Sequence, residues 1–335
     1  MNVQICNRLA GKLDRIRNGR YSPCDFIIAD AKDADMGGGI NGIGFAVDEN
    51  GSRTAKTSAD YLAAMIEMMQ SDLVDIMLTS MWSAEELNAR HAFDGSDITA
   101  AVRLNDSTDI WGLRGASYQA ISAAPFHTAR LEQARRLSAL GLYAITFYND
   151  RDLDVATLNA YRDFRQKAEK ADMRHFLEVF NPAFAINTGD TDLGAFINDA
   201  IVRCLAGVAK SERPLFLKMQ YNGARAMSEL AAFDPSNLIV GVLGGAAGTT
   251  RDTFELVVQT ERFGGRVALF GRKIYGAEDS VELVRLMRAV IEGELGTADA
   301  VRAYHDILSK KSVETARSLE DDIEVTDPIL KPEAQ

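Results

Sequence analysis

The chain has 335 residues, 47% of them apolar and 25% charged, an ordinary balance for a globular protein that buries a large core. Its formal net charge of -11 argues against non-specific binding to nucleic acid or to anionic membranes. Three scattered cysteines exclude a disulfide framework and a zinc knuckle. No segment has the apolar core of a signal peptide or the length of a membrane span, so we expect a cytoplasmic protein.

Strand-like and helix-like segments alternate along the chain. Apolar runs predict strands at 26–32, 74–80, 98–105, 143–149, 174–180, 214–221, 238–244 and 266–271. Helical periodicity predicts helices at 58–70, 84–91, 128–140, 153–171, 192–209, 224–232, 250–263 and 279–293. Eight β-α units predict an α/β fold, the (β/α)8 TIM barrel, with a doubly wound open sheet as the main rival.

The two ends of the chain look like additions to this barrel. Residues 2–17 have helical spacing and are expected to cap the bottom of the barrel, and residues 294–310 predict a helical extension. We therefore expect a single domain over residues 1–310. Residues 311–335 are acidic and contain prolines, which is typical of a loose tail or an oligomer arm. Barrels of this kind usually associate, so we expect a homo-oligomer.

Two inserts follow predicted strands and should therefore lie at the carboxyl face of the barrel, where active sites are built. The insert at 33–57 is rich in glycine, which fits either a mobile lid or an irregular insertion. The insert at 106–127 carries Trp111, Tyr118 and Phe126.

Lys218 lies near the end of the predicted strand at 214–221, in an apolar run that is typical of a buried parallel strand. A lysine is costly to bury as a cation unless a partner holds it. A neutral buried lysine is the nucleophile that forms a Schiff base with a ketone or aldehyde. From this strand alone, a structural ion pair or a lysine that reaches solvent remains open.

Polar residues end several other predicted strands as well. They are Asp30 and Lys32 on the first strand, Arg103 on the third, Tyr148 on the fourth, Glu178 on the fifth and Gln220 on the sixth. The carboxyl ends of barrel strands meet at one face, and polar groups inside a barrel must find partners. We therefore expect these side chains to satisfy one another around a ligand, although a structural role stays open for each alone.

Small residues follow the last two strands. Gly244 and Gly245 precede one predicted helix, and Gly271 and Arg272 follow the eighth strand. Small residues let backbone N–H groups approach an anion, and barrels often bind phosphate at these two loops. The sequence therefore predicts a phosphate site here, with simple tight turns as the other interpretation.

Metal chemistry has weaker support in the sequence. The four histidines do not cluster as zinc ligands. A set of four carboxylates could hold Mg²⁺ through oxygen ligands, namely Asp30, Asp33, Asp35 and Glu178.

Over residues 26–293 the chain resembles the class I, Schiff-base-forming aldolases of the barrel type. These include the tagatose-bisphosphate, deoxyribose-phosphate and archaeal-type fructose-bisphosphate aldolases. The segments that carry the resemblance are Leu217-Lys218-Met219, Leu177-Glu178-Val179-Phe180, Val242-Leu243-Gly244-Gly245, Phe270-Gly271-Arg272, Arg103-Leu104-Asn105 and Thr146-Phe147-Tyr148. The chain departs from the archaeal type in its first strand, which reads Asp30-Ala31-Lys32-Asp33 where that type carries Asp-His-Gly.

The resemblance implies reversible carbon–carbon cleavage of a phosphorylated ketose or related hydroxy-carbonyl compound, without a cofactor. Lys218 would form the Schiff base, with Lys32 as a second candidate nucleophile, and Tyr148 or Glu178 would move protons. Asp30 would orient the iminium or a substrate hydroxyl. The substrate or its phosphate would be bound by Arg103, Gln220, Gly244, Gly245, Gly271 and Arg272. The alternatives are an Mg²⁺-dependent lyase or isomerase and a non-catalytic barrel that binds sugar phosphates.

Overall fold

The computed structural model describes residues 4–47, 51–245 and 248–331. Eight strands form a closed parallel barrel in the order β1-β10-β9-β8-β7-β6-β5-β4, which confirms the predicted TIM barrel. The barrel strands are β1 (Ile27–Lys32), β4 (Ile76–Thr79), β5 (Thr99–Arg103), β6 (Leu140–Thr146), β7 (Arg174–Phe180), β8 (Leu217–Met219), β9 (Gly241–Leu243) and β10 (Val267–Phe270). The fourth barrel strand, β6, begins and ends three residues earlier than predicted.

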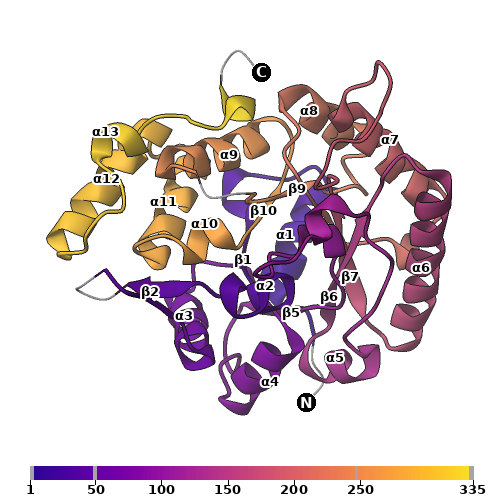
Figure 1. The fold of residues 1–335 in the computed structure, drawn as a ribbon, viewed down its shortest axis with the longest axis horizontal. Coiled ribbons are helices and arrows are strands. Elements are labelled where there is room, and N and C mark those ends of the chain that lie inside the picture. The colour runs from indigo at the N-terminus through magenta and orange to yellow at the C-terminus, as the bar shows by residue number, and fades with distance from the viewer. Residues whose placement is uncertain (1–3, 48–50, 246–247, 332–335) are drawn as a thin grey trace.

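Helices surround the barrel and shield the outer face of its wall. Figure 1 shows α6 and α7 on one side of the ring and α11 and α12 on the opposite side. The helices are α1 (Asn7–Arg17), α2 (Ala34–Gly42), α3 (Ser58–Ser71), α4 (Met81–Ala89), α5 (Leu131–Leu137), α6 (Arg151–Lys170), α7 (Leu193–Ala206), α8 (Ala224–Phe233), α9 (Thr250–Arg262), α10 (Arg272–Tyr275), α11 (Ser280–Ile291), α12 (Thr297–Lys310) and α13 (Leu319–Asp322). None of these helices, in the ranges described, is long and apolar enough to cross a membrane.

Strand pleating divides the core into two apolar clusters. Successive strand residues point to opposite faces, so Ile27 and Ala29 of β1 face the barrel interior. Ile28 faces the helix layer instead. The helix α1 closes the amino end of the barrel with Leu9 and Leu13, which join the interior cluster. The predicted N-terminal helix is thus present, although residues 2 and 3 of the predicted range lie outside the described residues.

The C-terminal segment is held against α9, which corrects the prediction of a loose tail. Asp252 caps α9 and accepts hydrogen bonds from the Thr326 backbone N–H at 2.8 Å and hydroxyl at 2.5 Å. The Gln259 amide donates to the Leu330 carbonyl at 2.8 Å, and the Leu330 side chain is buried. These hydrogen bonds replace bonds to water and fix the C-terminal segment on the surface of α9. Residues 332–335 of the predicted tail lie outside the described residues.

A two-stranded hairpin, β2 (Phe45–Val47) and β3 (Arg53–Ala55), follows α2 and completes the insert that was predicted as a lid or irregular insertion. Residues 48–50 of that insert lie outside the described residues.

Asp75 fastens the amino end of the barrel to two helices. Its buried carboxylate lies 2.9 Å from the Lys12 Nζ of α1 and 2.8 Å from the Arg288 guanidinium of α11. Burial raises the pKa of Asp75, but the charges of Arg288 and Lys12 outweigh burial and leave it below its usual value. The carboxylate therefore contributes stability above its unfolded pKa, and this contribution is lost as the pH falls through the folded pKa.

We expect Asp75→Asn to lower the free energy of unfolding at pH 7 by about 3–5 kcal/mol, because the buried Lys12 and the half-buried Arg288 and Arg8 lose their common carboxylate. Urea denaturation measures this loss. Asp72→Asn is the matched control, since the Asp72 side chain is 64% exposed in its pair with Arg8. That exposed pair is expected to contribute only about 0–1 kcal/mol. Equal losses in the two variants would contradict the anchoring role of Asp75.

Candidate active site

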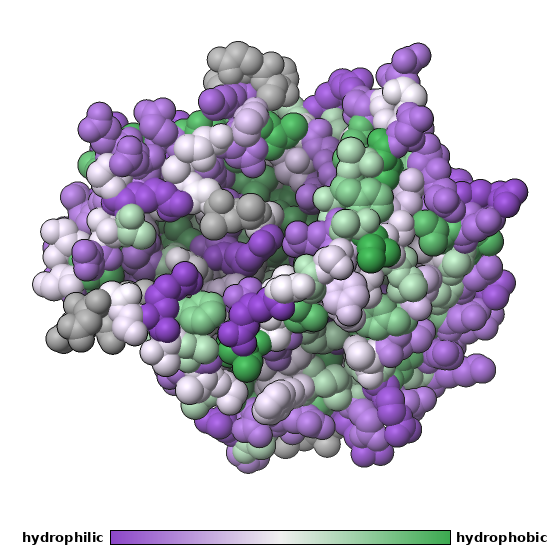
Figure 2. Space-filling model, in the orientation of Figure 1, coloured by the Kyte–Doolittle hydropathy of each residue, from purple (hydrophilic) through white to green (hydrophobic). Residues whose placement is uncertain are grey.

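A cavity of about 620 Å³ opens at the carboxyl face of the barrel. Figure 2 shows this face hollowed near its centre, with hydrophilic side chains at the rim. Strands from around the barrel contribute to its lining, among them the predicted site residues Arg103, Glu178, Lys218, Gln220, Gly244, Gly245, Gly271 and Arg272. The structure thus brings together most of the side chains that the sequence placed at the strand ends.

Lys218 and Glu178 form a cross-strand pair inside the cavity. Their Cα atoms are direct partners in the parallel pairing of β7 with β8. The two side chains have the same inward direction, because Phe176 on β7 and Phe216 just before β8, each two residues earlier in the chain, pack in the barrel interior. The Lys218 Nζ lies 2.6 Å from the Glu178 Oε1, and both residues are at most 4% exposed. A buried amine therefore has a carboxylate within proton-transfer distance.

Arg103 binds three carboxylates and fixes the other side of Glu178. One guanidinium nitrogen donates to the Glu178 Oε2 at 2.7 Å, and another donates to the Asp106 Oδ1 at 3.0 Å. The Arg103 Nε donates to Asp33. Burial lowers the pKa of Arg103, but the three carboxylates outweigh it and raise that pKa well above its ordinary value. Arg103 is therefore a permanent cation at the centre of this network.

The carboxylates around Arg103 differ in their affinity for protons. Burial raises the pKa of Asp33, but the charges of Arg103 and Lys218 outweigh it and leave the pKa below its usual value. Burial raises the pKa of Asp106 and outweighs the opposing charge of Arg103, and the charge of Glu178 adds to the rise, so that this pKa is about 6. Asp106 therefore titrates near neutral pH, where a group can act as both a proton donor and a proton acceptor.

Two tight backbone segments line the cavity after β9 and β10. A Cβ on Gly271 would lie 2.8 Å from the Ala31 carbonyl oxygen, so the close approach of these strands requires glycine. Gly245 has a positive φ of 67°, which also favours glycine. Arg272 lines the same part of the cavity, and its side chain is exposed. Glycine segments and a neighbouring cation are common at anion sites, and the binding of a phosphate here stays a prediction.

The helix α2 lies over the mouth of the cavity. Its Gly37 carbonyl accepts from the Gly112 N–H at 2.8 Å, and Asn41 donates to the Gly112 carbonyl at 3.0 Å. On the other side, the Tyr275 hydroxyl donates to the Gly42 carbonyl at 2.7 Å. The first part of the insert at 33–57 is thus a helical cover tied down at both edges, and its motion as a lid stays a prediction.

Asp30 and Lys32 lie on the opposite face of β1 from the cavity, which corrects their predicted place in the site. They alternate with the inward residues Ala29 and Ala31 and so point toward the helix layer. The Lys32 Nζ lies 2.9 Å from the Asp30 Oδ2, and both side chains are buried. Asp33, one residue beyond the strand, occupies the cavity instead.

Tyr148 also lies away from the main cavity. Because β6 ends at Thr146, Tyr148 belongs to the following loop, where its hydroxyl accepts from the Ala123 N–H at 2.8 Å. Its ring stacks on Phe184. Burial raises the pKa of Tyr148 to about 12. Glu178 touches Lys218, and Tyr148 hydrogen-bonds Asp109, which lines the cavity, so the choice between Tyr148 and Glu178 as the proton-transfer group stays a prediction.

The four carboxylates of the magnesium alternative do not converge. Asp30 is paired with Lys32 behind the barrel wall, and Asp35 accepts from the Ser80 hydroxyl at 2.5 Å. Asp33 and Glu178 both bind Arg103. Within the described ranges, no group of three or more His, Cys, Asp or Glu side chains is arranged to hold a metal ion.

Asp106 and Asp109 are cavity residues that the sequence reasoning did not select. Both belong to the insert after β5, whose position predicts the carboxyl face and whose aromatic residues are its most evident feature in the sequence. Their spacing from Arg103 is the signal that could have found them, since a cation at a strand end needs acidic partners close by.

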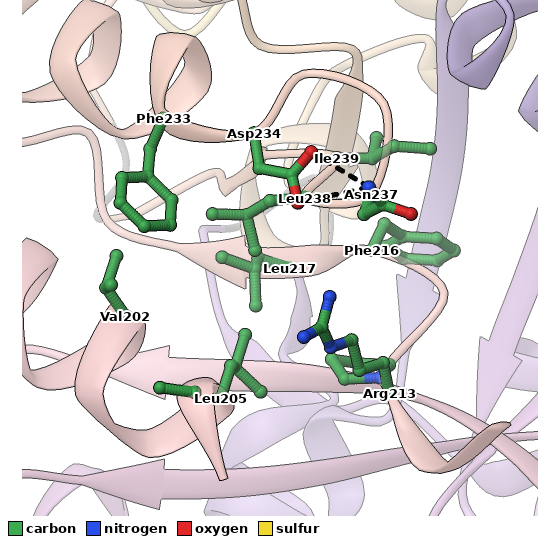
Figure 3. A pocket seen from close by; sticks show the side chains of 12 residues that line it. Val202, Leu205, Arg213, Phe216, Leu217, Phe233, Asp234, Asn237, Leu238 and Ile239 are labelled. Atoms are coloured by element: carbon green, nitrogen blue, oxygen red, sulfur yellow. Dashed lines mark hydrogen bonds between the residues drawn. The ribbon is translucent and has the colours of Figure 1, made fainter. Parts of the chain in front are cut away.

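Two further cavities are lined largely by apolar side chains. One of about 690 Å³ lies on the other side of α2 and includes the exposed residues Ile40 and Trp82. The other, of about 200 Å³, lies near the amino end of β8 beside α7 and α8. Figure 3 shows Val202, Leu205 and Phe233 around this small cavity. Neither cavity contains Lys218 or Arg103.

No model of a known protein family matches the chain, and no curated protein matches it. Solved structures do. An archaeal fructose-1,6-bisphosphate aldolase is 17% identical, with a TM-score of 0.55 over 85% of this chain and 99% of that chain. An archaeal fructose-1,6-bisphosphate aldolase with its catalytic lysine bound to a carbinolamine intermediate is 16% identical, with a TM-score of 0.57 over 85% and 99%. A fructose-bisphosphate aldolase from Slackia heliotrinireducens is 14% identical, with a TM-score of 0.59 over 95% and 98%.

The chain therefore shares the fold of archaeal-type class I fructose-bisphosphate aldolases, which use a Schiff-base lysine. At these identities the likeness concerns the fold, and the chemistry of this chain has to be argued from its own side chains.

We expect Arg103→Met to lower the free energy of unfolding at pH 8 by about 3–5 kcal/mol, because three buried carboxylates lose their common cation. Their folded-state pKa values would then rise above the unfolded values. The loss should therefore shrink as the pH falls to 5.5, because the folded variant binds more protons than the unfolded chain. Urea denaturation at the two pH values measures both effects.

The matched control is Arg151→Met, since the Arg151 side chain is 85% exposed. The Arg103 network would be contradicted by a loss in Arg103→Met that is the same at both pH values or no larger than in the control.

Proposed function

We propose that the protein is a class I aldolase that cleaves and forms a carbon–carbon bond of a phosphorylated hydroxy-carbonyl compound. The observation that carries the proposal is the Lys218 amine, buried in the cavity at the carboxyl face and 2.6 Å from the Glu178 carboxylate. A primary amine can attack a carbonyl only after it loses a proton, and Glu178 is placed to accept that proton.

The first half of the reaction forms the iminium. Lys218 attacks the substrate carbonyl carbon, and a proton passes from the attacking nitrogen to the carbonyl oxygen to give a neutral carbinolamine. Glu178 then returns a proton to this hydroxyl, which leaves as water while the nitrogen lone pair forms the C=N bond. The positively charged iminium stands next to the negative carboxylates of Glu178 and Asp33, which stabilise it more than they stabilise the neutral ketone.

The second half breaks the carbon–carbon bond. A carboxylate accepts the proton of the hydroxyl two carbons beyond the iminium carbon, the new carbonyl leaves as an aldehyde, and the bonding pair moves into the iminium to give an enamine. Asp106 is suited to this proton transfer, because it lines the cavity and its pKa is raised to about 6. Protonation of the enamine carbon and addition of water release the ketone and restore Lys218.

The remaining cavity residues bind rather than react in this proposal. Gly244, Gly245, Gly271 and Arg272 hold the phosphate, and Gln220 contacts the substrate between the phosphate and Lys218. Arg103 keeps Glu178, Asp33 and Asp106 oriented. The structural neighbours that act on fructose 1,6-bisphosphate support the class of reaction and leave the substrate of this chain open.

Borohydride trapping tests the proposed nucleophile. When the protein is incubated with dihydroxyacetone phosphate and a panel of ketose phosphates, reduction should leave a stable adduct on Lys218, located by peptide mass spectrometry. Lys218→Met should give no adduct and no turnover while keeping a cooperative thermal transition. An adduct on Lys32, or on no lysine with any carbonyl compound, would contradict the assignment.

Glu178→Gln tests the proton transfer to and from Lys218. We expect the rate of adduct formation to fall by about 10² or more, because a general acid–base residue typically contributes 10²- to 10⁴-fold. Stopping the trapping reaction at timed intervals measures that rate. Glu229→Gln is a matched control, since Glu229 bonds Asn198 on the outer helix layer. A wild-type rate in Glu178→Gln would assign the proton transfer to another group.

A further inference from the structure

The charged side chains of the cavity are distributed unevenly around its rim. The closed strand order puts β5 four places from β9 in either direction and β6 four places from β10. The glycine segments after β9 and β10 therefore stand across the barrel mouth from the loops after β5 and β6. A ligand that spans the mouth from the glycine segments past Lys218 extends toward the loop after β5.

The end of the cavity after β5 is acidic. Asp106 and Asp109 both line it and are buried. Asp109 accepts from the Ser107 hydroxyl at 2.6 Å and from the Ala183 N–H at 3.2 Å. These neutral donors orient the Asp109 carboxylate without cancelling its charge.

The cation nearest to this acidic end is already occupied. Arg103 binds Asp33, Asp106 and Glu178 together, so three carboxylates share one positive charge. Arg103 therefore has no net positive charge to offer a substrate phosphate at this end. Among the charged side chains in the described lining, four are acidic and three are basic, namely Asp33, Asp106, Asp109, Glu178, Arg103, Lys218 and Arg272.

The opposite end offers a different environment. Arg272 lines the cavity beside Gly271 and Gly244, and the part of the chain that the structure describes contains no ion pair to its guanidinium. The lining also contains neutral amide side chains that suit hydroxyl groups, namely Asn41, Gln119, Asn181 and Gln220.

We propose that the substrate carries one phosphate, held between Gly244–Gly245 and Arg272, and that its far end, facing Asp106 and Asp109, is an uncharged hydroxylated chain. This inference rests on the proposed aldolase function and narrows its substrate class to monophosphates. It separates this chain from the structural neighbours, which act on fructose 1,6-bisphosphate. A second phosphate would meet buried carboxylates, and like charges brought together at a binding site are strongly unfavourable.

The test compares two acceptor aldehydes that differ only in charge. Dihydroxyacetone phosphate is condensed with D-glyceraldehyde or with D-glyceraldehyde 3-phosphate, and kcat/KM for each aldehyde is measured by product formation at fixed ionic strength. We expect kcat/KM to be about tenfold or more higher for the neutral aldehyde. In Asp109→Asn the preference should shrink by about tenfold, through a gain with the phosphorylated aldehyde.

Asp199→Asn is the matched control for this charge change, because Asp199 is exposed on the outer helix α7. If Asp199→Asn reduced the preference as much as Asp109→Asn does, the effect would come from net charge and the assigned acidic end would be wrong.

Other results of the trapping and aldehyde experiments show whether the monophosphate inference or the aldolase function itself is wrong. If borohydride traps dihydroxyacetone phosphate on Lys218 but wild-type protein uses the phosphorylated aldehyde equally well or better, the aldolase function stands and the monophosphate inference falls. The monophosphate inference also falls if only unphosphorylated carbonyl compounds are trapped on Lys218. If no carbonyl compound in the panel gives an adduct, the aldolase function itself is overturned.

Discussion

A single guanidinium holds the active-site face together. Arg103 binds carboxylates that come from three different places, the end of β1, the loop after β5 and strand β7. Four buried charges in so small a volume would be unfavourable without tight mutual pairing, because each has left water. The arrangement leaves one oxygen of Glu178 free to bind Lys218 and fixes its direction. In the proposed mechanism, both the reactivity of the amine and the acidic character of one end of the cavity depend on this one side chain.

The barrel fold explains how charged side chains that are far apart in the sequence meet around Arg103 and Lys218. Asp75 and α1 close the amino end, and the paired strands then carry inward side chains to the opposite face at fixed heights. The C-terminal segment also supports the carboxyl face from outside the barrel. Its hydrogen bonds to Asp252 hold the first turn of α9, the helix that follows the glycine segment after β9. The cover α2 is tied to the loop after β5 and to Tyr275, so the insert and the acidic end form one connected rim.

The barrel fold and most of the cavity residues could be predicted from the sequence. The predictions that were wrong have physical causes. The β8 segment alternates Phe216, Lys218 and Gln220 with apolar residues, so its inward face is visible in the sequence. The β1 segment reads Ile-Ile-Ala-Asp-Ala-Lys, in which small and polar residues alternate and either face could be inward. Only packing decides the direction, which is why Asp30 and Lys32 were placed among the aldolase residues and Asp33 only in the magnesium alternative. Tyr148 was misplaced because the bounds of β6 depend on its pairing with β7, which the local sequence does not specify.

The most direct test of the account is a crystal structure of the protein reduced with borohydride in the presence of dihydroxyacetone phosphate. We expect electron density continuous from the Lys218 Nζ into the ligand, with the phosphate between Gly244–Gly245 and Arg272 and with Glu178 still bound to Arg103. A ligand attached to another residue would contradict the proposed chemistry. A ligand attached to Lys218 with its phosphate beside Asp106 would contradict the proposed polarity of the cavity.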